Sequence, residues 1–434
     1  MSAANPMKKF RGMLPLAGLA AVLLAGNAAA ESLQQAWDTA LAADRSLKAT
    51  RENTAAAADL LEAAKSARLP NVALEAGYTA LDQTPAAKAE FFGQSLQMPL
   101  AQKESGAYKA MATLPLYTGG RIERGIDAAA AGLEAARLGE AGDVQNLKLR
   151  VADAYVNGLR AGRMLKVAQS HVESLTAHAR DVENLHEQGM VAKSDLLSAR
   201  VALADARQKA LQAANALDLA RAAYNRLLGR PLEQAVSLDE LAPEAGQPSL
   251  ARLSERALVQ RTELAALARQ IEALRHQAAA VRGENRPQVA LSGGYGYQEN
   301  RYQVHEGQWM VTLGARWNLF DGGVVSHRAG AVERQAAALT EQREDLASVI
   351  TLQVRQAWLD VEETRKRIEV TQSAIAQAEE NLRVVRDRYT NGLSTNTEVL
   401  DAETLRVNSE ANHAAALYDA ALAGLRLKRA VGEL

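Results

Sequence analysis

The sequence predicts a mainly helical protein with a small β portion, built from two copies of one structural unit. Three observations support this fold class: an alanine-rich composition with only 4% aromatic residues, an order of segments that occurs twice, and a hydrophobic period that changes from helix-like to strand-like within each copy. A chain of this kind packs long helices against each other through small side chains.

The charge balance and the absence of cysteine exclude several classes of function. Lysine and arginine number 50 against 51 aspartates and glutamates, so the charge gives no indication of nucleic-acid binding. Without cysteine there is no disulfide, thiolate metal site, cysteine nucleophile or lipidated cysteine. The seven histidines are scattered, and no nucleophile stands near a base at a meaningful spacing. We therefore predict no enzyme, no cofactor and no metal site.

The first 30 residues have the pattern of a signal peptide. Three basic residues between positions 8 and 11 precede an apolar run, and Ala28-Ala29-Ala30 follows it, which predicts cleavage before Glu31 and export of the mature chain. A membrane anchor is the alternative, although about 13 apolar residues are too few to span a bilayer. Met7 is an alternative start to Met1, because the signal is complete without residues 1–6.

The chain after residue 30 contains an internal duplication. The segment from Pro70 to Tyr78 matches the segment from Pro287 to Tyr295, and Gly119-Gly120 matches Gly322-Gly323. The first copy carries 14 extra residues between its proline and its double glycine. Three prolines in residues 230–249 mark a linker between the copies.

This duplication divides the chain into a signal peptide (1–30), a first repeat (31–229), an equatorial linker (230–249) and a second repeat (250–434). Each repeat is expected to begin with a helix and to continue with a β-hairpin, a long helix, a tip turn and a returning helix. These last four segments are predicted at about 70–118, 121–188, 189–194 and 195–229, and again at about 287–320, 324–391, 392–397 and 398–432.

The long segments without proline predict two very long helices. Small and apolar residues recur at alternating steps of three and four from Leu147 to Val182 and from Val361 to Tyr389, which is a heptad pattern. At about 1.5 Å per residue, each helix would extend roughly 100 Å. Such a helix has no place in a globular domain, so we expect it to cross a large space in an extended bundle.

Between the proline and the double glycine of each copy, the hydrophobic period becomes two, which predicts strands. Trp309 and Trp317 stand on one face, roughly 26 Å apart at about 3.3 Å per residue. This is the spacing of the aromatic girdles on a transmembrane β-strand, and Tyr297 and Tyr117 complete the predicted girdle. A hairpin at the edge of a soluble sandwich is the alternative.

Four strands per chain cannot close a barrel, and open sheet edges are not tolerated in lipid. Three copies would supply twelve strands, an even number. If the strands lie in outer-membrane lipid, we therefore expect a homotrimer.

These residues resemble the TolC family of outer membrane efflux proteins. The resemblance rests on the proline-led strand entries, the Leu-aromatic-x-Gly-Gly strand exits, and two turn motifs, from Gly189 to Asp195 and from Gly392 to Glu398. It implies a homotrimer in the bacterial outer membrane, with a 12-stranded β-barrel that continues into a periplasmic α-barrel. It also implies a passive exit duct for efflux or type I secretion, coupled through a periplasmic adaptor protein to an inner-membrane RND or ABC transporter.

The resemblance further implies functional residues at the two tip turns. Asp195, Glu398 and Asp401 match acidic residues of the constriction, and Tyr389 matches a gating tyrosine. Ser394 stands where some members place a gating arginine, which argues against a salt-bridge latch at that position. The adaptor would dock on the turns themselves, at Gly189, Met190 and Val191 and at Gly392, Leu393 and Ser394.

Local chemistry offers simpler interpretations of the same residues. Ser194 and Thr397 are expected to cap the returning helices, and an acid in the first turn favours the positive end of the helix dipole. Asp401 lies about one turn further on and is therefore the better gate candidate. The apolar residues of the turns could also pack as a cap on the neighbouring hairpin.

The competing function class is a trimeric coiled-coil scaffold or adhesin of the cell envelope without a conduit. That class explains the heptads but not the duplicated amphipathic hairpins with their tryptophans.

Overall fold

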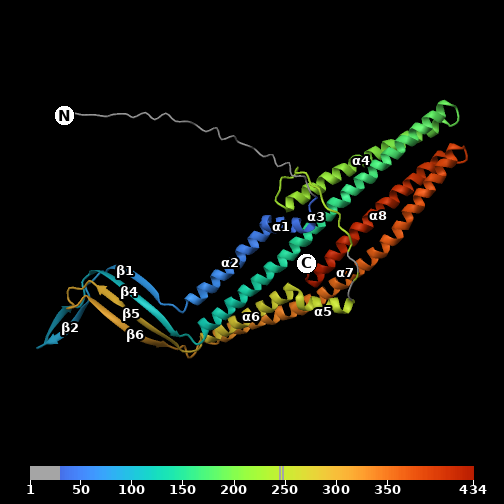
Figure 1. Ribbon diagram of the computed structural model, residues 1–434. Coiled ribbons are helices and arrows are strands. Elements are labelled where there is room, and N and C mark those ends of the chain that lie inside the picture. The colour runs from blue at the N-terminus through green and yellow to red at the C-terminus, as the bar shows by residue number, and fades with distance from the viewer. Residues whose placement is uncertain (1–29, 244–245, 247–248) are drawn as a thin grey trace, which may run out of the picture.

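The computed structural model describes residues 30–243, 246 and 249–434. The predicted signal peptide lies outside the described residues except for Ala30, as does part of the predicted linker. The described chain is an elongated body, with a β-sheet at one end and the turns of two helical hairpins at the other (Figure 1).

The described residues form eight helices and six strands. The helices are α1 (Leu33–Ala43), α2 (Arg45–Ser66), α3 (Arg121–Glu187), α4 (Lys193–Leu227), α5 (Leu250–Gln260), α6 (Thr262–Gly283), α7 (Val324–Thr390) and α8 (Asn396–Val431). The strands are β1 (Asn71–Ala80), β2 (Ala86–Phe91), β3 (Gln94–Pro99), β4 (Glu104–Tyr117), β5 (Gln288–Gln298) and β6 (Gly307–Arg316).

Helices α3 and α7 run without interruption through most of the body (Figure 1). Each has 67 residues, about 100 Å at 1.5 Å per residue, and each begins after a glycine with a φ of 86°. A side chain at Gly119, just before α3, would also lie 2.5 Å from the carbonyl oxygen of Gly283, which explains the double glycine there. Nearest the sheet, α2 and α6 pack beside the long helices; beyond the middle, α4 and α8 take their places.

Two apolar clusters form the middle of the body, here called the waist. The first joins α1, α3 and the end of α4, and its centre contains Leu147, Val151, Tyr155 and Tyr224. The second joins α5, α6, α7 and α8 around Ile350 and Val354. The core of the protein is therefore duplicated along with the sequence.

The four-stranded sheet has the antiparallel order β1-β4-β5-β6, so one hairpin comes from each repeat. The predicted fold class, mainly helical with long helices, four sheet strands and an internal duplication, is confirmed. In addition to these four strands, β2 and β3 form a separate hairpin at the far end of the sheet, which the sequence analysis did not predict (Figure 1). The extra residues of the first repeat are long enough to fold back on themselves, and the turn is made at Phe92 and Gly93, which have φ values of 50° and 75°.

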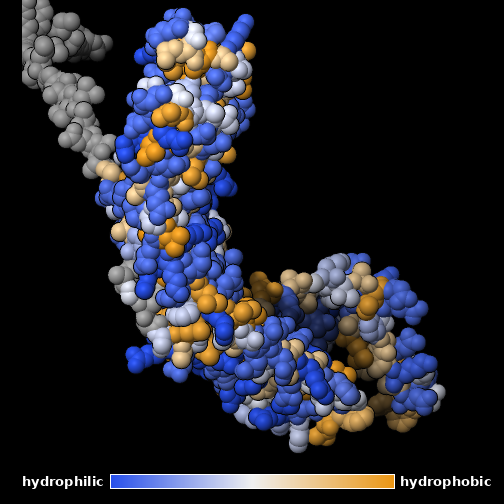
Figure 2. Space-filling model, turned by 90° about the vertical axis from the view of Figure 1, so that its right-hand side faces the viewer, coloured by the Kyte–Doolittle hydropathy of each residue, from blue (hydrophilic) through white to orange (hydrophobic). Residues whose placement is uncertain are grey.

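Among the described residues, no helix combines the length and the apolar character that crossing a membrane requires. Figure 2 shows that the surface of the tall helical part is mostly hydrophilic, with hydrophobic residues in small groups.

Candidate functional site

The two faces of the four-stranded sheet differ sharply in polarity. The β5–β6 register places Leu291 opposite Leu313 and Tyr295 opposite Trp309, while the neighbouring positions carry pairs such as Ser292 with Thr312. One face is therefore apolar and includes the following side chains: Val72, Leu74, Tyr78, Tyr108, Leu114, Leu291, Tyr295, Trp309, Val311 and Leu313. The other face is polar and includes Glu75, Lys109, Thr113, Ser292, Gln308 and Thr312.

The apolar face is exposed in the single chain. Trp309 is 81% exposed and Val311 is 78% exposed. Exposed apolar patches of this extent mark surfaces that another phase or partner covers. The opposite face offers polar groups to water, so the sheet separates an apolar environment from an aqueous one.

The predicted girdle residues lie toward the two ends of this apolar face. Tyr297 and Trp309 lie toward the outer end, where Tyr297 stacks on Tyr108 at a centroid distance of 5.0 Å. Tyr117 and Trp317 lie at the helical end, where the Trp317 indole donates a hydrogen bond to the Asn285 carbonyl (3.0 Å). Aromatic side chains with one polar atom suit the two borders of a hydrocarbon layer.

At the opposite end of the body, both tip turns have the same backbone. Gly189 and Gly392 have φ values of 72° and 71°, which confirms the left-handed conformation expected of them. The amide of Met190 donates to the Leu185 carbonyl (2.9 Å), and the amide of Leu393 donates to the Arg388 carbonyl (2.8 Å). The duplication therefore extends to the hydrogen bonds that end α3 and α7.

The helix starts after these turns differ from the prediction. Ala192 and Thr395 stand at the N-cap positions, so the assignment of Ser194 and Thr397 as caps was wrong. The helices begin earlier than expected because each turn needs only a few residues after its glycine. The methyl side chain of Ala192 cannot accept a hydrogen bond and so cannot cap α4, whereas the Thr395 hydroxyl accepts one from the Glu398 amide (3.3 Å).

Glu398 also takes part in this cap through its side chain. Its carboxylate accepts hydrogen bonds from the hydroxyls of Ser394 (2.6 Å) and Thr395 (3.2 Å). These bonds, that of Ser394 first, lower the pKa of Glu398 below its usual value. Glu398 therefore stabilises the start of α8, as the helix-capping interpretation expects. Asp401 is exposed on α8 and takes no part in this cap.

Tyr389 and Asp195 lie close together inside the tips. Tyr389 belongs to an apolar cluster formed by all four helices, from Ala179 and Val182 on α3 to Val399 and Ala402 on α8. Its hydroxyl is buried without a hydrogen-bond partner among the described residues. Burial, and then the negative charge of Asp195, raise the pKa of Tyr389.

Asn396, which the sequence analysis did not single out, links the two tips. Its side-chain amide donates to the Asp195 carbonyl (3.2 Å), and its Oδ1 lies 2.8 Å from Nε2 of the buried His178. With the Asn396 oxygen acting as acceptor, His178 donates from Nε2. Burial lowers the pKa of His178 and favours this neutral form.

A second link, also missed, is the fully buried carboxylate of Glu403 on α8. It lies 3.2 Å from His171 Nδ1 on α3, 2.7 Å from the Arg406 guanidinium and 3.4 Å from that of Arg386. Burial by itself would raise the pKa of Glu403, but the hydrogen bonds from His171 and Arg406 lower it to about 2. The only sequence signal was an acid four residues after the core residue Val399.

The predicted docking residues divide into exposed and packed ones. Met190 and Leu393 are 65% and 68% exposed, and the two turn glycines are exposed as well. Val191, in contrast, packs against the tip cluster, as the cap interpretation expects. Ser394 is half-buried and bound to Glu398.

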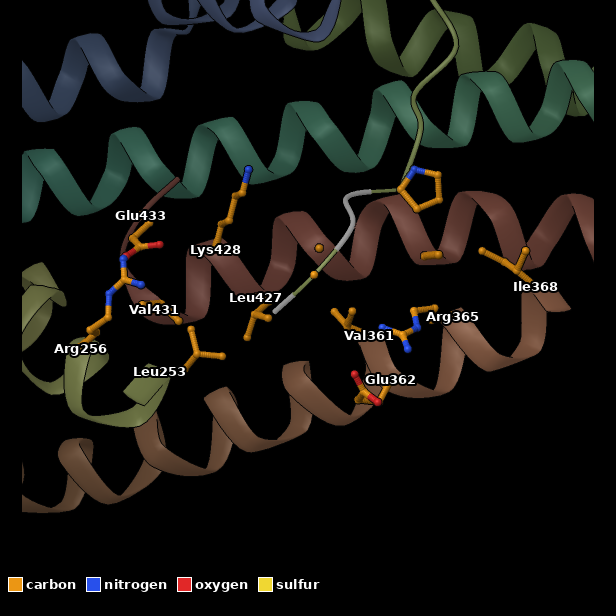
Figure 3. Close-up of a pocket in the computed structure, with 14 residues that line it drawn as sticks. Leu253, Arg256, Val361, Glu362, Arg365, Ile368, Leu427, Lys428, Val431 and Glu433 are labelled. Carbon is orange, nitrogen blue, oxygen red and sulfur yellow. The ribbon is translucent and has the colours of Figure 1, made fainter. Parts of the chain in front are cut away.

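A cavity of about 140 Å³ lies at the waist, where α5, α7 and α8 meet. Figure 3 shows the residues that line it. Leu253, Val361 and Leu427 line it, and the ion pair between Arg256 and Glu433 lies at one end. These apolar residues also belong to the second waist cluster, so the cavity is an edge of that core. Among the described residues, no group of three or more histidines, aspartates and glutamates is placed to hold a metal ion.

Known proteins share both the sequence pattern and the fold. The sequence model of the outer membrane efflux protein family matches residues 36–230 and 253–433. Outer membrane protein TolC of Escherichia coli K12 is 23% identical over 450 residues, which cover 99% of this chain and 87% of that protein. The outer-membrane channel OprN has a TM-score of 0.78 at 22% identity, covering 93% of this chain and 90% of that one. VceC from Vibrio cholerae also has a TM-score of 0.78, at 20% identity, covering 92% and 96%.

A two-faced sheet continued by helices of this length defines a membrane channel with a long helical extension. The chain belongs to the outer membrane efflux protein family, which is the TolC family. It is therefore a non-enzymatic channel for efflux or secretion, located in the outer membrane with a helical periplasmic domain.

Proposed function

We propose that this chain is the passive exit duct of a tripartite efflux or type I secretion system and works as a homotrimer. The observation that carries the proposal is the open sheet. Within the described part of the chain, β1 and β6 each have a strand neighbour on one side only, and the apolar face between them is exposed. Unpaired backbone groups are not tolerated in hydrocarbon, so β6 of one copy would pair with β1 of the next. Three copies would then close a 12-stranded barrel.

The polar face of the sheet would line the water-filled interior of this barrel. The helices continue from the same strands, because α3 follows β4 and α7 follows β6 after short double-glycine links. Three copies of the helical part would therefore form a tunnel coaxial with the barrel. Its length of roughly 100 Å suits a periplasmic passage.

The tip turns would form the closed end of the tunnel and the contact with the adaptor. Three copies of Asp401, together with Asp195 and Glu398, would surround the axis and favour cations. Tyr389 would hold the closed packing of the tips. Met190 and Leu393 would contact a periplasmic adaptor protein, which connects the duct to an inner-membrane RND or ABC transporter that selects the cargo.

Pairs of introduced cysteines test the trimer directly, since the chain has none of its own. Glu75→Cys on β1 should form disulfides with one position of a β6 series, Gln308→Cys, Met310→Cys and Thr312→Cys, and oxidation should produce covalent trimers in native outer membranes. The matched control is Ala213→Cys on α4, far from either edge. Exclusively monomeric products for the whole series would contradict the proposal.

Charged substitutions test the docking surface. Leu393→Arg and Met190→Arg should each abolish export while trimer yield stays normal, because both side chains are exposed and contribute little to folding. Val191→Arg serves as the comparison, since it should lower trimer yield by disturbing the tip cluster. Normal export and normal adaptor cross-linking in both of the first two variants would remove the docking assignment.

A further inference from the structure

Glu31, the residue after the predicted cleavage position, is held to the linker by hydrogen bonds of its backbone. Its amide nitrogen donates to the Ser237 carbonyl (2.8 Å), and the Asp239 amide donates to the Glu31 carbonyl (3.1 Å). These bonds make a short parallel bridge between Glu31 and Leu238. The start of the described chain is therefore tied to the linker between the two repeats.

The side chain of Glu31 is bound just as fully. Its carboxylate accepts two hydrogen bonds from the Arg230 guanidinium (2.6 and 2.8 Å) and one from the Tyr224 hydroxyl (2.9 Å). Tyr155 places its hydroxyl 2.7 Å from the Glu31 carbonyl, and both tyrosine side chains are almost completely buried in the first waist cluster. These contacts hold both the backbone and the side chain of Glu31 in one position on the waist.

This arrangement is incompatible with cleavage of the folded chain at Ala30–Glu31. Proteolysis concentrates at exposed and mobile segments, and peptide recognition in extended form uses main-chain hydrogen bonds. Here the Glu31 amide and carbonyl are already occupied by the linker and Tyr155. Cleavage must therefore precede the docking of Glu31 on the waist.

We propose that the waist contains a binding site for the α-ammonium group that signal-peptide removal creates on Glu31. In that step an export protease hydrolyses the Ala30–Glu31 peptide bond: water adds to the Ala30 carbonyl carbon, Ala30 leaves as a carboxylate, and the Glu31 nitrogen becomes an amine that takes up a proton. The nitrogen that donates one hydrogen bond in the precursor then has three N–H donors and a positive charge.

The surroundings of Glu31 suit that charge. The carbonyl oxygen of Ser237 already faces the nitrogen. Besides burial, the negative charges of Asp239, Glu31 and Glu240 help to raise the pKa of the neighbouring Tyr155 hydroxyl. Against the effect of burial, the positive charge of Arg230 lowers the pKa of Glu31. Asp239 belongs to the linker segment that pairs with Glu31, so its carboxylate favours a cation there, and hydrogen bonds to charged donors are stronger than neutral ones.

The reactivity of the α-amine tests this proposal. Intact-mass analysis of the purified trimer should give a chain that begins at Glu31. An amine-acylating reagent at neutral pH should then label the α-amine at least about tenfold more slowly in the native trimer than in the urea-unfolded chain, because a protonated, bound amine is a poor nucleophile. A different first residue, or equal labelling rates, would overturn the proposal.

Two variants distinguish a specific binding site for the α-ammonium group from mere burial of the chain end. Asp239→Asn removes one exposed carboxylate and should speed the labelling of the native α-amine several-fold, while Glu233→Gln in the same linker should not. A foreign signal peptide that is cleaved before Ala30 should displace the ammonium group by one residue and restore labelling close to the unfolded rate. Unchanged slow labelling in both Asp239→Asn and the extended chain would contradict a charge-specific site.

Discussion

At the sheet end of this molecule, large apolar side chains such as Val311 and Leu313 stand on the surface, whereas at the hairpin tips the carboxylate of Glu403 is completely buried. The sheet is one layer thick, so it has no interior in which to bury an apolar face. The tips are a bundle of four helices, so they do have an interior, and a charge there needs partners from the protein itself. The stability of the sheet therefore depends on what covers its apolar face from outside the chain, while the stability of the tips depends on contacts within one chain.

A charge on the apolar face of the sheet should have the largest effect on assembly. Val311→Lys should abolish assembly in the outer membrane, because a lysine near the centre of the hydrocarbon costs about 2 to 4 kcal/mol in each chain. Thr312→Lys, on the next residue and the opposite face, should assemble normally. Trimer recovery from outer membranes measures both, and equal recovery would show that the apolar face does not contact lipid.

Removal of the buried charge at the tips should have the next largest effect. Glu403→Ala leaves Arg406 with only Glu410 as a carboxylate partner and removes the acceptor of His171, so it should destabilise the tips by about 1 to 3 kcal/mol. Glu379→Gln, an exposed acid on α7, is the control. Amide hydrogen exchange should accelerate around residues 171–178 and 396–406 while exchange in the sheet stays unchanged. Slow exchange at the tips of Glu403→Ala would show that the cluster does not hold the hairpins together.

Substitution of exposed tip acids should change conduction without changing stability. Asp401→Asn should lower the cation selectivity of the channel in planar bilayers, because its carboxylate is free of any cap. Glu398→Gln should have the smaller effect, since the Glu398 carboxylate is held by Ser394 and Thr395. Wild-type selectivity in both variants would remove these acids from the gate.

At the tips, acid should produce the smallest effect of the four. Burial lowers the pKa of His178 below its ordinary value of 6.5, so the unfolded state takes up a proton first and stability falls as the pH drops below 6.5. Glu403, with its pKa lowered to about 2, adds a second loss between about pH 4.5 and 2, because protonation removes its advantage over the unfolded chain. Hydrogen exchange at the tips should show both steps, and His178→Gln should remove only the first. A first step that survives in His178→Gln would assign it to another group.

Much of the architecture was predictable because it depends on local patterns. A heptad period predicts a long packed helix wherever it occurs, and a period of two predicts a two-faced strand. Gly189 and Gly392 were expected in the left-handed conformation because ending a helix by this turn favours a residue without a Cβ. The β2–β3 hairpin was missed because Ala86 to Pro99 lacks a clear alternation. The N-cap of α8 was assigned wrongly because the second tip turn contains four consecutive residues, Ser394 to Thr397, whose side chains can all cap a helix.

The sequence by itself thus determined the duplication, the two long helices, the polarity of each sheet face and the membership of a channel family. Only the tertiary structure decided which polar residues join the two repeats. Glu403 meets His171 from 232 residues away, and Asn396 meets His178 from 218 residues away. A pattern read along one helix shows that a residue faces inward, but it does not show what it faces. The partner is set by how α3 and α8 lie against each other, and that depends on the packing of the whole bundle.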